Sequence, residues 1–148
     1  MRARIGKHPI HPMLIPFPIA LWIFSLFCDV VYLMVSGNTF WADAAFYTMA
    51  GGIIGALFAA PFGLVDFLAL TDANVKRIGK AHMVINLVLV VLFALDLWLR
   101  KIGMPIGGWP VVLSATGIIL LAVSGWLGGE MVYVHGVAVE PPGANARR

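Results

Sequence analysis

The chain has 148 residues, of which 61% are hydrophobic and only 11% are charged. That is too little polar surface to coat a water-soluble globule, so the composition predicts an integral membrane protein. The formal net charge of +3 is small and gives no reason to expect a nucleic-acid partner.

Four apolar stretches are long enough to cross a hydrocarbon core of about 30 Å as helices. Glycines and Pro105 break the chain between the last two, and polar residues separate the others. Short connections favour an all-α, antiparallel four-helix transmembrane bundle, with one domain over residues 1–140 and a disordered tail at 141–148. The predicted spans are Leu14 to Val35, Trp41 to Leu70, Met83 to Leu99, and Trp109 to Val134, with a polar loop from Thr71 to Ala81.

The basic residues predict the orientation of the bundle. Only Arg100 and Lys101 fall in the predicted outer connections, whereas the other eight of the ten lysines and arginines lie at the opposite edge. The positive-inside rule therefore places both termini on the inner side. We expect a multi-pass protein of the bacterial inner (cytoplasmic) membrane, with the lipid bilayer as its main partner. The eight inner basic residues are Arg2, Arg4, Lys7, Lys76, Arg77, Lys80, Arg147 and Arg148.

All four histidines fall at this predicted inner edge, and ionisable side chains near hydrocarbon are costly and usually functional. His8 and His11 each precede a proline, which favours extended backbone and places their rings roughly 9 Å apart. His82 opens the third predicted span and His135 closes the fourth, so antiparallel neighbours should present them at similar depth. Two imidazoles facing each other across a bundle core would suit axial ligation of a b-type haem.

Several neighbours of the histidines are candidate site residues as well. Asn86 lies one turn beyond His82, and the basic side chains of Lys7, Arg77 and Lys80 could pair with haem propionates. Trp126 could line the pocket with Trp22 and Tyr133, although aromatic residues near an interface also serve as anchors.

Two carboxylates lie near the same edge. Asp66 and Glu130 could orient a ligating histidine through its second ring nitrogen, or could themselves bind a metal ion. Glu130 and His135 are five residues apart, about 140° around an α-helix, so they do not form the Glu-x-x-His pair of di-iron bundles.

Small residues recur at helical spacing in two of the spans. Gly51, Gly55, Ala59 and Gly63 form one ladder, and Ser124 with Gly128 belongs to another. Such ladders allow close helix packing in lipid. They could also leave a slot in which a flat cofactor lies against the backbone.

Three segments carry a resemblance to a known family: HPIHPMLIPFPIALW near the start, AHMVIN in the third span, and GWLGGEMVYVHGVAV at the end. Over nearly the whole chain the sequence resembles a bacterial four-span membrane family known as domain of unknown function 2231. Members are similar in having histidines at the positions of His8, His11, His82 and His135, and some are fused to Rieske-type redox modules. The resemblance implies a redox setting, with haem as one option.

The main hypothesis is a b-type cytochrome that binds one or two haems through these four histidines and transfers electrons. It could be a subunit of a larger respiratory or photosynthetic complex, contact redox partner proteins, or form a homo-oligomer. One alternative is a site for Zn, Cu or Fe built from His82, His135, Asp66 and Glu130. Another is a structural or assembly subunit without a cofactor. We do not expect an enzyme, because the sequence has no nucleophile with a neighbouring base and no phosphate loop.

Overall fold

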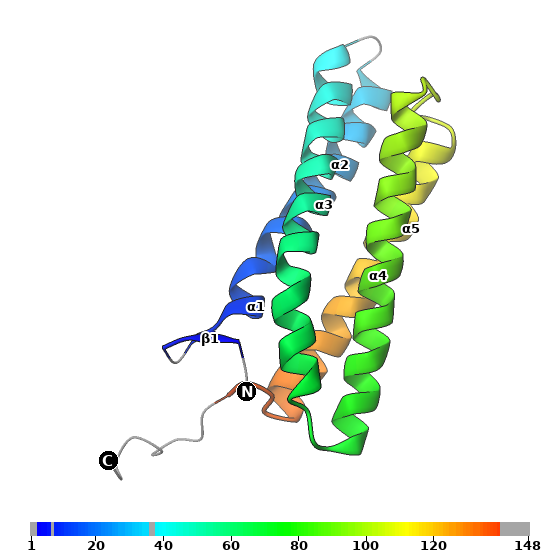
Figure 1. The fold of residues 1–148 in the computed structure, drawn as a ribbon. Helices are drawn as coiled ribbons and strands as arrows, with labels where there is room; N and C mark the ends of the chain where they lie inside the picture. Colours follow the sequence, from blue (N-terminus) through cyan, green and yellow to red (C-terminus); the bar gives the residue numbers. More distant parts are fainter. Residues whose placement is uncertain (1–2, 7, 36–37, 140–148) are drawn as a thin grey trace.

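The computed structural model describes residues 3–6, 8–35 and 38–139 and consists almost entirely of helix. A short hairpin of β1 (Arg4–Ile5) and β2 (His8–Pro9) precedes α1 (Ile10–Leu14) and α2 (Pro16–Met34). The long helices α3 (Thr39–Leu68), α4 (Ala73–Lys101) and α5 (Trp109–Gly129) follow, and α5 continues into the π-helix η1 (Glu130–Val134). The predicted all-α four-helix bundle is confirmed (Figure 1). The predicted tail at 141–148 lies outside the described residues.

We use two names for the ends of the bundle. The histidine end carries the α3–α4 connection, residues 69–72, together with the β-hairpin and η1 (Figure 1). The arginine end carries the α2–α3 connection and the α4–α5 connection, residues 102–108. The two described extremities of the chain therefore lie at the same end of the bundle.

Helix α4 begins ten residues earlier than the apolar pattern predicts. Asp72 caps it, because its carboxylate accepts hydrogen bonds from the backbone N–H groups of Asn74 (2.8 Å) and Val75 (2.9 Å). The first turns are mostly polar and exposed, whereas Val75 and Gly79 are buried and Ile78 is half-buried. Of the predicted loop from Thr71 to Ala81, only Thr71 and Asp72 lie outside the helix, because a good N-cap starts the helix before its side chains become apolar. His82 consequently lies inside α4 rather than at its beginning.

The segment around the first two histidines also differs from the prediction of extended backbone. His8 is in a strand, paired with Ile5, but His11 is helical. Helix α1 begins at Ile10, so Pro12 stands in the first turn, where its missing N–H group has no helical partner to lose. The helix resumes as α2 after Ile15, and the two pieces together form the first span, Ile10–Met34.

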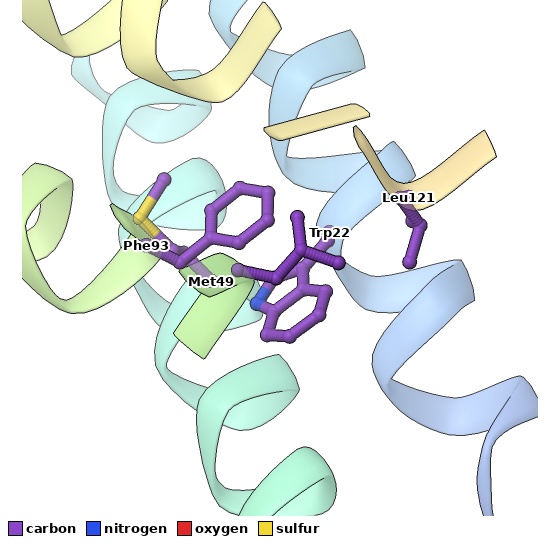
Figure 2. Packing of buried hydrophobic residues seen from close by; sticks show 5 residues of the cluster. Trp22, Met49, Phe93 and Leu121 are labelled. Atoms are coloured by element: carbon purple, nitrogen blue, oxygen red, sulfur yellow. The ribbon is translucent and has the colours of Figure 1, made fainter. Parts of the chain in front are cut away.

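The four spans pack as two helical hairpins, α2 with α3 and α4 with α5, and these contact each other less extensively than their own members do. Between them lies a core around Trp22 and Phe93, whose rings stack with their centroids 4.4 Å apart (Figure 2). Gly52 and Gly117 make room for this stack. A methyl group would come within 2.5 Å of Trp22 at the first position and within 2.6 Å of Phe93 at the second. These two glycines lie outside the predicted ladders and allow the helices to pack closely in the core.

Most of the large apolar side chains face outward. Phe58, Val91 and Ile119 are 63%, 69% and 67% exposed, one on each of α3, α4 and α5. Exposed apolar surface all round the long helices would be unstable in water but is what a bilayer solvates. The protein is a multi-pass membrane protein.

Candidate functional site

His82 is held by three groups between α4 and α5. Its Nδ1 lies 2.9 Å from the backbone carbonyl oxygen of Ser124 and 3.1 Å from the hydroxyl of the same residue. The Asn86 amide donates to the backbone carbonyl of His82 and to the Ser124 hydroxyl, both at 2.7 Å. The candidate residues His82 and Asn86 thus belong to one interhelical network, centred on Ser124.

His11 is held in the same manner by a different helix. Its Nδ1 lies 3.1 Å from the backbone carbonyl oxygen of Ala59 on α3. Ala59 is buried, and His11 itself is half-buried. The ring therefore projects from α1 onto α3, within the hairpin that does not contain His82.

These contacts fix the tautomer of both rings. A carbonyl oxygen can only accept a hydrogen bond, so Nδ1 must carry the proton in His11 and in His82. In the neutral rings Nε2 then has a free lone pair. A histidine that binds a metal or haem iron commonly shows this arrangement, with one nitrogen donating to a carbonyl and the other available to the metal.

The two anchored rings come from different halves of the bundle. His11 belongs to the α2–α3 half and His82 to the α4–α5 half. The histidine end therefore presents one imidazole from each half, both with the same nitrogen anchored.

Each ring rests on a glycine of the predicted ladders. A methyl group at Gly63 would lie 2.9 Å from Cε1 and Nδ1 of His11, so only glycine leaves room for that ring. At Gly128 a methyl group would lie 3.4 Å from Cε1 of His82, an ordinary contact. One glycine of each ladder thus contacts an imidazole ring, in addition to the role of the ladders in helix packing.

His135 does not lie opposite His82. Gly128 faces His82, and Gly79 of α4 faces Met131, so the antiparallel register carries His135 away from His82. Seven residues separate Gly128 from His135, which corresponds to about 10 Å along a helix at about 1.5 Å per residue. The prediction of a similar depth for His82 and His135 is therefore wrong, because His82 lies well inside α4.

The π-helix changes the relation between Glu130 and His135. The backbone N–H of His135 donates to the carbonyl of Glu130 at 3.2 Å, a bond that spans five residues. The wider turn brings residues five apart onto one side, so His135 Nε2 lies 4.0 Å from Glu130 Oε1. The separation of about 140° holds for an α-helix and does not apply here. Both side chains remain about one-third exposed.

The remaining candidate residues lie around this end without joining the two rings. His8 is exposed on β2, and Arg77 and Lys80 are exposed on the first turns of α4. Asp66 accepts a hydrogen bond from the backbone N–H of Ala3 at 3.0 Å and so ties the N-terminal hairpin to α3. Lys7 lies outside the described residues.

Two of the candidate aromatic residues point away from the site. Trp126 is 77% exposed and Tyr133 is 89% exposed, so both face outward. Trp22 is buried but belongs to the stacked core. Trp126 and Tyr133 therefore fit the alternative role of interface anchors better than that of pocket residues.

In the described part of the chain, no three histidine, cysteine, aspartate or glutamate side chains converge as the ligands of a metal ion would. The set His82, His135, Asp66 and Glu130 is dispersed, because Asp66 binds the N-terminal hairpin and Glu130 faces His135. A haem iron needs fewer protein ligands, because the porphyrin supplies four ligands and the protein supplies only the two axial ones.

The arginine end holds a second polar cluster that the sequence did not reveal. Arg100 binds Asp29 through Nη1 at 2.6 Å and Nη2 at 2.7 Å, and binds Asp96 through Nε at 2.8 Å. Ser114 donates to Asp96 at 2.7 Å. The arginine side chain is only 5% exposed and the two aspartates are fully buried. Two features of the sequence could have indicated this cluster. Asp96 and Arg100 are one helical turn apart, and a further aspartate, Asp29, lies inside an apolar span.

Comparison with known proteins gives one match. The family model described as "Predicted membrane protein (DUF2231)" covers residues 7–141 of the chain. The chain belongs to this family. The match includes both anchored histidines, the serine that His82 contacts and the arginine cluster, so the whole bundle of this DUF2231 member is the family's domain. No curated protein and no solved structure matches it.

Proposed function

We propose that this DUF2231 protein is a b-type haem protein of the bacterial inner membrane that carries electrons. His11 and His82 would supply the axial ligands of one haem at the histidine end. The observation that carries this proposal is the matched state of the two rings: each donates Nδ1–H to a backbone carbonyl and keeps the Nε2 lone pair free.

The surroundings of the two rings agree with the chemistry of such a site. Carbonyl acceptors at Nδ1 fix the ring orientation and raise the basicity of Nε2, which strengthens its bond to iron. The Asn86 amide and the Ser124 hydroxyl brace the His82 side of the site. Arg77 and Lys80, exposed on the first turns of α4, are the cations available for propionates.

One haem is better supported than two. His8 is exposed on β2, and His135 is partly exposed beside Glu130. In the described part of the chain, neither of these two rings contacts a backbone carbonyl as His11 and His82 do. Bound haem would supply a reversible one-electron change at the histidine end, and a redox partner would have to approach that end of the bundle.

The test is an absorption spectrum of the detergent-purified protein after haem-sufficient expression, oxidised and then reduced with dithionite. We expect a Soret band and a sharp α band, with haem quantified as its pyridine haemochrome. His11→Ala and His82→Ala should each lose most of the haem, and His8→Ala, the matched control on the exposed strand, should keep it.

Two results would contradict the proposal. One is a colourless wild-type protein after haem-sufficient expression, and the other is full haem occupancy in both His11→Ala and His82→Ala. Stoichiometric Zn, Cu or Fe without porphyrin would instead favour the metal-site alternative, and a protein with neither would favour a structural subunit.

A further inference from the structure

The cluster at the arginine end carries an imbalance of charge. It contains two carboxylates, Asp29 and Asp96, but a single cation, Arg100, and all three side chains are buried. With both carboxylates ionised, the cluster has a formal net charge of −1 inside an apolar bundle. An uncompensated charge at such a position is costly, so the cluster should bind one further positive charge.

The two carboxylates are not equivalent. Asp29 receives two short hydrogen bonds from Arg100, at 2.6 and 2.7 Å, one on each oxygen. Asp96 receives only one short bond from Arg100, on Oδ1, whereas its Oδ2 lies 3.3 Å from Nη2 and 2.7 Å from the Ser114 hydroxyl. A hydroxyl can donate or accept, so the contact with Ser114 suits either protonation state of Asp96. Among the described residues, the Asp29 carboxylate hydrogen-bonds only to Arg100, and a guanidinium can only donate.

Water can approach the Arg100 side of the cluster from the nearby end of the bundle. A partly open cavity of about 320 Å³ is lined by Arg100, by Tyr32 and Asp43, and by residues 103–106 of the α4–α5 connection. At about 30 Å³ per molecule, it has room for roughly ten waters. Asp43 is exposed at its rim.

We propose that the Asp29, Asp96, Arg100 and Ser114 cluster is a proton-binding site reached from the arginine end, with the proton on Asp96 Oδ2 and hydrogen-bonded to Ser114 Oγ. On binding, a proton from water adds to the carboxylate of Asp96 and the formal charge of the cluster becomes zero. Around this site lie Asp29 and Tyr32 from α2, Asp43 from α3, Arg100 from α4 and Ser114 from α5, and the buried Cys28 precedes Asp29 in the chain. The proposal does not depend on haem, whose proposed ligands lie at the other end.

Infrared difference spectroscopy of the full chain in lipid nanodiscs tests this site directly. At neutral pH we expect the C=O stretching band of one protonated carboxyl group per chain, with a shift in D₂O. Asp96→Asn should lose the band, and so should Asp29→Asn, because one carboxylate then balances Arg100 without a proton. Asp43→Asn is the matched control at the cavity rim and should keep the band.

Absence of the band in the folded wild type would overturn the proposal, as would a band of full intensity in Asp96→Asn. Ser114→Ala is a second variant in case Asp96→Asn does not fold. It removes the proposed acceptor, so the band should move to higher frequency, and an unmoved band would overturn the assignment to Asp96 Oδ2.

Discussion

Gly63→Ala should show how tightly the bundle holds the His11 ring. The new methyl group would lie 2.9 Å from both Cε1 and Nδ1 of His11, where carbon atoms normally approach to about 3.5–4.0 Å. The ring or the helix must therefore move by roughly 0.5–1 Å. Such overpacking costs about 1–3 kcal/mol, and loss of the bond to the Ala59 carbonyl costs about 1 kcal/mol. The better helix propensity of alanine offsets about 1 kcal/mol, which leaves a net loss of about 1–3 kcal/mol.

Gly128→Ala is the matched control, because its methyl group would lie 3.4 Å from Cε1 of His82 and needs little adjustment. We expect its free energy of unfolding to stay within about 1 kcal/mol of the wild type. Steric-trap unfolding in bicelles would measure both variants, and nitrogen NMR of the imidazole would report whether His11 Nδ1 still donates. Equal stability of the two variants, with the His11 hydrogen bond retained, would refute the reasoning.

Two further predictions concern the buried polar groups, both measured by the same unfolding assay. Arg100→Met leaves two buried carboxylates without their cation and should lower the free energy of unfolding by about 3–5 kcal/mol. Lys101→Met, at the exposed neighbouring residue, should change it by less than about 0.5 kcal/mol. Equal effects of the two substitutions would contradict the burial of the Arg100 cluster. Asn86→Leu removes hydrogen bonds to His82 and Ser124 and should cost about 0.5–2 kcal/mol. Thr116→Val is its control, because that hydroxyl bonds only within its own helix; a larger loss for Thr116→Val would argue against the network.

The membrane character and the four spans followed from the sequence alone, for a general reason. In hydrocarbon every backbone polar group needs a partner within the protein, and a continuous apolar run of about 20 residues satisfies its own groups as a helix. Short connections then make neighbouring helices antiparallel. The start of α4 was missed because hydropathy identifies only the part of a helix that lies in lipid. The helix itself begins earlier, directly after Asp72, which caps it through its hydrogen bonds.

The sequence also placed the histidines at one end of the bundle, because the position of a residue along its span determines which end it occupies. Which histidines meet depends on register and on local backbone, and only the tertiary structure decides these. The register of α4 against α5 puts His82 opposite Gly128 rather than opposite His135. The turn of α1 puts His11 on Ala59, and the π-helix brings Glu130 to His135.

The arginine cluster likewise depends on tertiary packing that the sequence alone does not determine. From the sequence, Arg100 was assigned to an outer connection, and Asp29 and Asp96 lie in two different apolar spans. Their association needs α2 and α4 to meet at one depth, a relation between residues 71 positions apart. Composition and hydropathy along the chain determine which segments enter the membrane. Packing between the segments decides which polar side chains share a site, because that choice depends on distances across the bundle.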